Sequence, residues 1–90
     1  MRYRYVSLCV EWTDGKDIGE TCAFLNGSGA CGLAVDEDMD LQYIPGQSFR
    51  HAHTVFRFRV RRTVPVHELL SALAMRPGVY SVAEIGRIFR

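Results

Sequence analysis

TVFRFRVRRTVPVHELLSALAMRPGVYSV, residues 54–82, is the stretch that decides the fold of this chain. In its first part apolar side chains alternate with arginines, which is the pattern of a strand with one buried face and one solvated face. We therefore expect a strand over 55–62. Its two faces are an inner one of Phe56, Phe58 and Val60 and an outer one of Arg57, Arg59 and Arg61.

A helix is expected after this strand. Pro65 suits a first helical turn, because its φ is already fixed and the N–H that it lacks would have no partner there. Apolar residues then recur at helical spacing and form one stripe, Val66, Leu69, Leu70 and Leu73. Arg76 is expected in the last turn, where a cation complements the helix dipole. Pro77 should end the helix, and Gly78 should turn the chain into a strand that starts at Val79.

The first half of the chain repeats this order in a looser form. Residues 2–12 alternate between apolar and other side chains, which predicts a strand. Thr13 or Asp14 can cap a following helix, and Gly27 can end it. A second alternating run, residues 33–43, predicts the next strand. The expected core positions of the first strand are Val6, Leu8 and Val10.

The predicted order is β-α-β-β-α-β in a single domain, residues 1–90. Right-handed crossovers in both β-α-β halves lay the two helices on the same face of one sheet. We therefore expect an α+β, ferredoxin-like two-layer sandwich with a four-stranded antiparallel sheet and two helices on one face. The other face of the sheet is expected to be open to water or to a partner. The last segment, 79–90, has an open register, because Val82 and Ile85 cannot share a face without a bulge.

The hairpin between the second and third strands carries a prediction about charge. Pro45-Gly46 ends the second strand, and we expect the turn to be centred between Ser48 and Phe49. Opposite charges would then lie directly across the two strands and contribute roughly 0.2–1 kcal/mol for each pair. The expected pairs are Arg57 with Asp40, Arg59 with Asp38 and Arg61 with Asp36.

Composition limits the function classes. The formal net charge of +1 gives no protein-wide basic field of the kind that drives nucleic-acid binding. Three cysteines without a C-x-x-C spacing indicate a reduced, cytoplasmic setting rather than a disulfide scaffold. The longest uncharged run, 21–35, is too short and too rich in glycine to span a bilayer. The first residues do not form a secretory signal peptide.

No combination of residues predicts catalysis, a metal or a cofactor. The acidic run 36–40 lies on a strand and cannot wrap a cation, and His51 and His53 lack the further ligands that a metal site needs. Cys9 has no base near it in the sequence, so it does not form a recognisable nucleophile. The sequence therefore favours a non-enzymatic module.

Two surfaces could bind a partner. The loop after the first strand opens a helix, with Asp17 and Glu20 in its first turn, and helix N-terminal amides can hold a carboxylate or phosphate. The candidate ligand-binding residues are Asp14, Gly15, Asp17 and Gly19; the alternative is a plain capped turn. The outward arginine row, together with Tyr3 and Tyr5, offers a second interpretation as a nucleic-acid-binding module. The aspartates expected opposite that row argue against it.

The βαββαβ order, the loop over 14–19 and the closing motif within 69–82 resemble an ACT-type regulatory domain. The ending, a helix followed by P-G-V-x-x-V, is similar to the ACT-like C-terminal cytoplasmic domain of MgtC/SapB-type membrane proteins. The resemblance implies a regulatory or protein-interaction module that forms a homodimer and takes a small-molecule effector. It also implies a membrane-embedded remainder of a longer protein, with this domain on the cytoplasmic side of the inner membrane.

Overall fold

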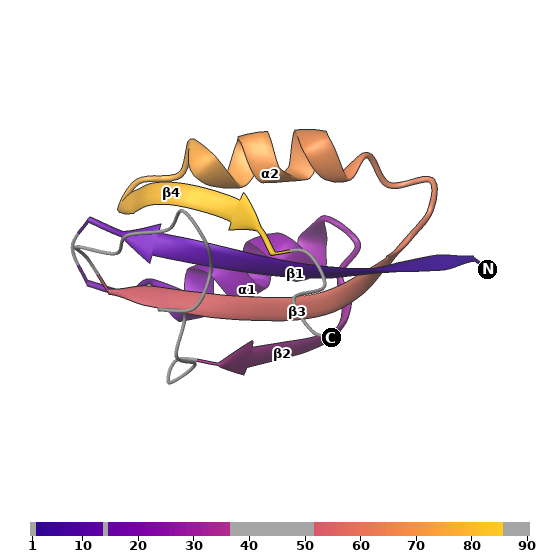
Figure 1. Ribbon diagram of the computed structural model, residues 1–90, viewed down its shortest axis with the longest axis horizontal. Helices are drawn as coiled ribbons and strands as arrows, with labels where there is room; N and C mark the ends of the chain where they lie inside the picture. Colours follow the sequence, from indigo (N-terminus) through magenta and orange to yellow (C-terminus); the bar gives the residue numbers. More distant parts are fainter. Residues whose placement is uncertain (1, 14, 37–51, 86–90) are drawn as a thin grey trace.

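The computed structural model describes residues 2–13, 15–36 and 52–85. Strands and helices follow one another in the predicted order (Figure 1). They are β1 (Tyr3–Trp12), α1 (Ile18–Gly27), β2 (Cys31–Asp36), β3 (His53–Arg61), α2 (Val66–Ala74) and β4 (Val79–Glu84).

The four strands form one antiparallel sheet in the order β2-β3-β1-β4. Residues from both helices, including Leu25 of α1 and Leu73 of α2, belong to the same core cluster as Val6 and Phe56 of the central strands. Both helices therefore cover the same face of the sheet, and α2 lies alongside β4 (Figure 1). The fold is the predicted ferredoxin-like α+β sandwich.

The core lies between the sheet and the helices, at the positions that the alternation predicts. The buried members from the central strands are Val6, Leu8, Val10, Trp12, Phe56, Phe58 and Val60. From α2, the stripe contributes Val66, Leu69 and Leu73, while Leu70 is only partly buried. The predicted inner faces of the first and third strands and the stripe of the second helix are confirmed.

Helix α1 is capped by a different residue from the one expected. Thr13 lies before the helix and Asp14 lies outside the described residues, whereas Asp17 is the N-cap and its Oδ1 accepts a hydrogen bond from the N–H of Glu20 over 3.4 Å. An Asp at the N-cap satisfies one of the amides that the first turn leaves without a partner. Asp17 therefore precedes the first turn instead of lying in it.

Helix α2 also ends earlier than expected. It stops at Ala74, and its last turn is tightened by bonds from the N–H groups of Met75 and Arg76 to the carbonyls three residues before each. Arg76 therefore lies beyond the helix, with its guanidinium carbon 5.1 Å from the ring centroid of Phe24 in α1. The cation stacks on an aromatic ring of the other helix instead of serving the dipole of its own.

The register of β2 against β3 corrects the predicted charge pairs. Asp36 lies opposite Val55 instead of Arg61, and Arg57 lies opposite Ala34. The observed register differs from the predicted one by an even number of residues, so the arginines still lie on the outward face. Asp36 still reaches Arg57 diagonally, with Oδ2 and Nη1 3.8 Å apart. The other expected partners, Asp38 and Asp40, lie outside the described residues.

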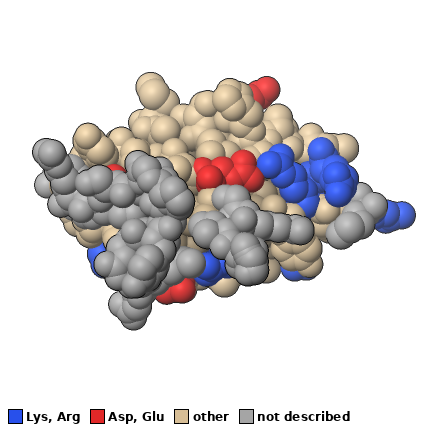
Figure 2. Space-filling view, viewed as in Figure 1, with Lys and Arg blue, Asp and Glu red and all other residues tan. Residues whose placement is uncertain are grey.

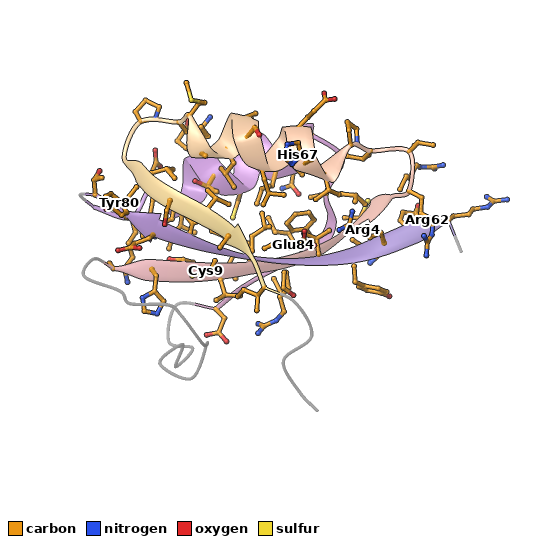
Figure 3. All side chains as sticks on the ribbon, turned by 45° about the horizontal axis from the view of Figure 1, so that its top comes forward. Arg4, Cys9, Arg62, His67, Tyr80 and Glu84 are labelled. Carbon is orange, nitrogen blue, oxygen red and sulfur yellow. The ribbon has the colours of Figure 1, made fainter. Side chains whose placement is uncertain are left out.

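The last strand has a defined register where the described residues end. Val82 lies opposite Val10, Glu84 lies opposite Leu8, and an irregularity falls between Glu11 and Trp12 on the partner strand. At this end of β4, Nη2 of Arg4 lies 3.0 Å from Oε2 of Glu84 (Figure 3). Val79 pairs with Trp12 and Ser81 with Glu11, so the extra residue is Tyr80 of β4, and the register does not shift between Val82 and Glu84.

The sheet face turned away from the helices is only partly open, which corrects the expectation of a solvated face. Cys9 and Val55 lie opposite each other on this face and are 4% and 0% exposed. Glu11, two residues further along β1, is also buried. The open part is therefore the other half, where β1 begins and β3 ends.

Candidate functional site

The described residues of the predicted ligand loop do not enclose a concave site. Gly15, Asp17 and Gly19 are exposed, and no atom lies within 4 Å of where a Cβ would be at either glycine. The Asp17 carboxylate already accepts the Glu20 N–H. Asp14 lies outside the described residues. Ligand binding by this loop stays a prediction, because its described residues do not surround a space that could hold a ligand.

A second set of candidate residues lies on the open half of the sheet. The two central strands pair so that Tyr3 lies opposite Arg61, Tyr5 opposite Arg59 and Ser7 opposite Arg57. Alternate residues of a strand share a face, so all six side chains lie on the side away from the helices. We call this set, Tyr3, Tyr5, Ser7, Arg57, Arg59 and Arg61, the arginine–tyrosine face.

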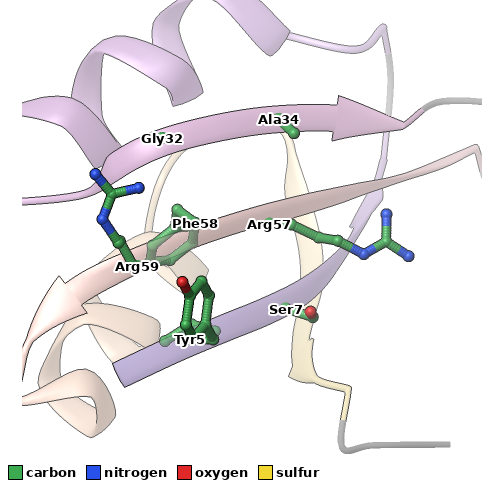
Figure 4. A pocket seen from close by; sticks show the side chains of 8 residues that line it. Tyr5, Ser7, Gly32, Ala34, Arg57, Phe58 and Arg59 are labelled. Atoms are coloured by element: carbon green, nitrogen blue, oxygen red, sulfur yellow. The ribbon is translucent and has the colours of Figure 1, made fainter. Parts of the chain in front are cut away.

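A hollow of about 190 Å³ opens in this face (Figure 4). Ser7, Gly32 and Ala34 supply small side chains or none, which leaves space between the larger residues at its sides. Tyr5 and Arg59 border it, and the Tyr5 side of the hollow is strongly solvated, because that residue is 71% exposed. The hollow is therefore accessible from the solvent and has an aromatic side and a cationic side.

Gly32 determines where the Arg59 guanidinium can lie. Its φ is +63°, in the left-handed region that favours glycine, and it falls within the irregularity of β2 between Cys31 and Ala34. A Cβ built at Gly32 would be 2.6 Å from Nη1 of Arg59. Figure 4 shows the Arg59 guanidinium beside Gly32, while Arg57 extends in the opposite direction. The glycine thus makes room for the cation over the edge strand.

The ring of Tyr3 holds two of the arginines near each other. The guanidinium carbons of Arg59 and Arg61 lie 5.4 and 5.8 Å from its centroid. Such contacts at exposed sites contribute about 0.5–1 kcal/mol each. A guanidinium that contacts an aromatic ring still carries N–H donors that can bind a carboxylate or phosphate.

The charge around this face is locally positive, although the net charge of the chain is only +1. Within residues 2–13, 15–36 and 52–85, no carboxylate forms an ion pair with Arg59 or Arg61. Arg62 follows Arg61 in the chain, and blue atoms gather at the end of the molecule where β1 begins and β3 ends (Figure 2). Arg4, on the opposite face of β1, is paired with Glu84 and does not add to this charge. This end of the sheet therefore attracts anions.

Cys9 and Cys22 do not show the features of a reactive site. Burial, with a smaller contribution from the charge of Glu11, raises the pKa of the Cys9 thiol to about 11. Burial also raises the pKa of Cys22. A thiol that stays protonated at neutral pH is a poor nucleophile and a poor metal ligand.

The described part of the chain contains neither a candidate metal site nor a helix that could cross a membrane. There, no group of three or more His, Cys, Asp or Glu residues could hold a metal ion. The helices of the same residues are all too short or too polar to cross a bilayer. Among the described residues, the arginine–tyrosine face is therefore the candidate binding surface.

Comparisons with models of protein families, with curated proteins and with solved structures gave no match to this chain. The site is thus defined by its geometry. The alternation in β3 predicted the outward arginines, and Tyr3 and Tyr5 were linked to them in the sequence. The contributions of Gly32, Ala34 and Ser7 were missed, because only the pairing of β2 and β1 with β3 brings these residues to one place.

Proposed function

We propose that this chain is a non-enzymatic binding module that recognises an anionic partner on its arginine–tyrosine face. One observation carries the proposal: Arg59, which lines an accessible hollow, shares the ring of Tyr3 with Arg61, and no described carboxylate pairs with either arginine. A guanidinium is the side chain best suited to bind oxygen anions through paired N–H donors.

The placement of these residues on strands supports a binding role. β1 and β3 are the two central strands, so each is held by neighbours on both sides. Side chains on such strands keep their spacing when a ligand arrives, whereas those on a loop must first be ordered. The side chains of the site are therefore organised in advance of binding.

A titration with inorganic polyphosphate tests the proposal. We expect binding that weakens as salt rises, since ionic contacts with exposed arginines are screened. Substituting Arg59 and Arg61 together by alanine should reduce the affinity by about tenfold or more, because hydrogen bonds to charged groups contribute about 1.5–3 kcal/mol. Arg62→Ala removes a nearby charge that lies off the face, and it should change the affinity by less than about threefold.

Two results would refute the proposal. One is the absence of polyphosphate binding even at low salt. The other is equal loss of affinity in Arg62→Ala and in variants of the face, which would reflect overall charge and no site. Circular dichroism of each variant checks that the fold is retained.

The ACT-like resemblance supports a regulatory use of such a module, with an effector or partner that carries negative charge. A homodimer and a membrane-embedded remainder on the cytoplasmic side are the other predictions that the resemblance implies. Sedimentation at several concentrations tests the first, and the complete reading frame tests the second. Neither is needed for the anion-binding proposal.

A further inference from the structure

The repeat distance of the arginine–tyrosine face narrows the kind of anion that fits it. Alternate residues on a strand are separated by about 7 Å, so the Cα atoms of Arg59 and Arg61 lie about this far apart, as do those of Tyr3 and Tyr5. Neighbouring phosphates of a nucleotide strand are joined through one sugar and are separated by a similar distance along the backbone. The face therefore suits adjacent phosphates of a nucleotide strand.

Tyr5 provides a surface on which one unstacked base can lie. It is 71% exposed and borders the hollow of about 190 Å³. This hollow is smaller than the roughly 300–1,000 Å³ of pockets that enclose a complete small ligand. It therefore suits a partner that inserts one flat group and spreads the rest of its length over the surface. Stacking on an aromatic side chain is how proteins commonly hold bases of single strands.

Tyr3 and Tyr5 have different tasks in this arrangement. The ring of Tyr3 already carries the guanidinium groups of Arg59 and Arg61. Tyr5 lies opposite Arg59 and is the more exposed of the two tyrosines. Tyr3 thus positions the cations for phosphates, and Tyr5 is available for a base.

From this geometry we infer that the anionic partner is a single-stranded nucleic acid, with one base stacked on Tyr5 in the hollow and adjacent phosphates bound by Arg59 and Arg61. The inference rests on the proposed function. An acidic peptide satisfies the arginines equally well, but its carboxylates make no use of an exposed aromatic ring beside a hollow with small side chains. A duplex keeps its bases stacked and cannot offer one to Tyr5.

Fluorescence anisotropy with labelled 12-nucleotide single strands of RNA and of DNA, in mixed sequence, tests this inference on the complete chain. We expect both strands to bind, and the matching duplex to bind at least about tenfold more weakly. The logarithm of the affinity should fall with the logarithm of the salt concentration with a slope of about −1.4, because two phosphates contribute about 0.7 each for a single strand.

Variants at Tyr5 separate stacking from simple charge attraction. Tyr5→Ala should weaken single-strand binding by about 5- to 100-fold, the range found when a stacking aromatic is truncated. Tyr5→Phe keeps the ring and should stay within about twofold of the original protein. Tyr80→Ala is the matched control: Tyr80 is 61% exposed and lies at the other end of the sheet (Figure 3), so its loss should leave binding unchanged. Because Tyr5 is exposed, the variants should fold, and circular dichroism checks this.

The outcomes distinguish the two proposals. If polyphosphate or polyglutamate binds as tightly as the single strands and Tyr5→Ala has no effect, anion binding stands and the nucleic-acid inference is overturned. If the duplex binds as tightly as the single strands, the inference is likewise overturned. If no anion binds, the proposed function fails together with it.

Discussion

The buried hydrogen bond between Trp12 and Thr54 allows a stringent test of the core. Nε1 of Trp12 donates to Oγ1 of Thr54 over 2.9 Å, and the two residues are 1% and 0% exposed. Thr54→Val replaces the hydroxyl by a methyl group of similar size. The indole N–H then loses the acceptor that it has in the structure, while the packing around it changes little.

The expected cost follows from leaving this donor buried. A buried polar group without its partner costs about 1–3 kcal/mol. A value near the middle, about 2 kcal/mol, corresponds to a fall in Tm of about 8–16 °C for a domain of this size. Trp12→Phe should also destabilise, because the indole packs edge-on against Phe56 with centroids 6.4 Å apart and an interplanar angle of 72°.

The double variant isolates the hydrogen bond from the packing. In the Trp12→Phe background the donor is already gone, so Thr54→Val leaves no buried polar group without a partner. The loss in free energy of unfolding caused by Thr54→Val should therefore be about 1–2 kcal/mol smaller in this background. Urea unfolding followed by circular dichroism suits all four proteins, because Trp12 is the single tryptophan and its fluorescence is lost in two of them. If Thr54→Val costs the same in both backgrounds, or nothing in either, the hydrogen bond does not stabilise the core and the reasoning is wrong.

Three further predictions concern the rest of the molecule. Gly32→Ala should lower the free energy of unfolding by about 1–2 kcal/mol, because the φ of Gly32 is +63°. It should also weaken polyphosphate binding, because the added methyl group displaces Arg59. Unchanged stability in urea unfolding and unchanged affinity in anisotropy titrations would contradict this. Cys9 should react with iodoacetamide at pH 8 much more slowly in the folded protein than in urea, because its pKa is raised to about 11. The contribution of the protonated thiol to the free energy of unfolding is present below the pKa of the unfolded thiol, near 9, and should be lost as pH rises through about 11. Cys9→Ala should therefore make the free energy of unfolding less dependent on pH in this range. An equally steep dependence in the variant would exclude the thiol as the cause. Arg4→Ala should cost less than about 1 kcal/mol, and less still in high salt, because the pair with Glu84 is exposed; a larger, salt-independent loss would show that Arg4 stabilises the fold by other means.

The buried faces of β1, β3 and α2 could be predicted, because each depends on the order of residues within a single element. The alternation in β1 and β3 and the stripe of α2 each follow from one residue type recurring at the period of its own element, and their inner faces were confirmed. The cap of α1 was predicted wrongly, as Thr13 or Asp14, for a physical reason: Thr13, Asp14 and Asp17 can all accept from a helix N-terminus, and only the folded chain selects Asp17.

Features that depend on distant residues could not be predicted in the same way. Asp36 pairs with Val55, so the observed register is not the one that follows from a turn centred between Ser48 and Phe49. Alternation also shows that the two faces of a strand differ without showing which is covered. The apolar Cys9 and Val55 on the arginine-bearing side were the signal that part of this side is buried.

The candidate site was predictable only in part. The outward arginines follow from the period of β3, and the two tyrosines follow from the period of β1. The hollow, in contrast, needs Gly32 of an edge strand beside Arg59 of a central one. Residues so far apart in the sequence come together only through the register, which the charge pattern had placed wrongly.

The interruption at Gly32 has a consequence for how copies of this chain can associate. A bulged outer strand twists away from the straight ladder that backbone-to-backbone addition requires, so β2 resists lengthening of the sheet. β4, at the opposite border, also carries an extra residue, Tyr80, so only 81–84 pair with β1 without interruption. Both outer strands of the sheet are therefore bulged, which hinders the addition of further strands at either edge.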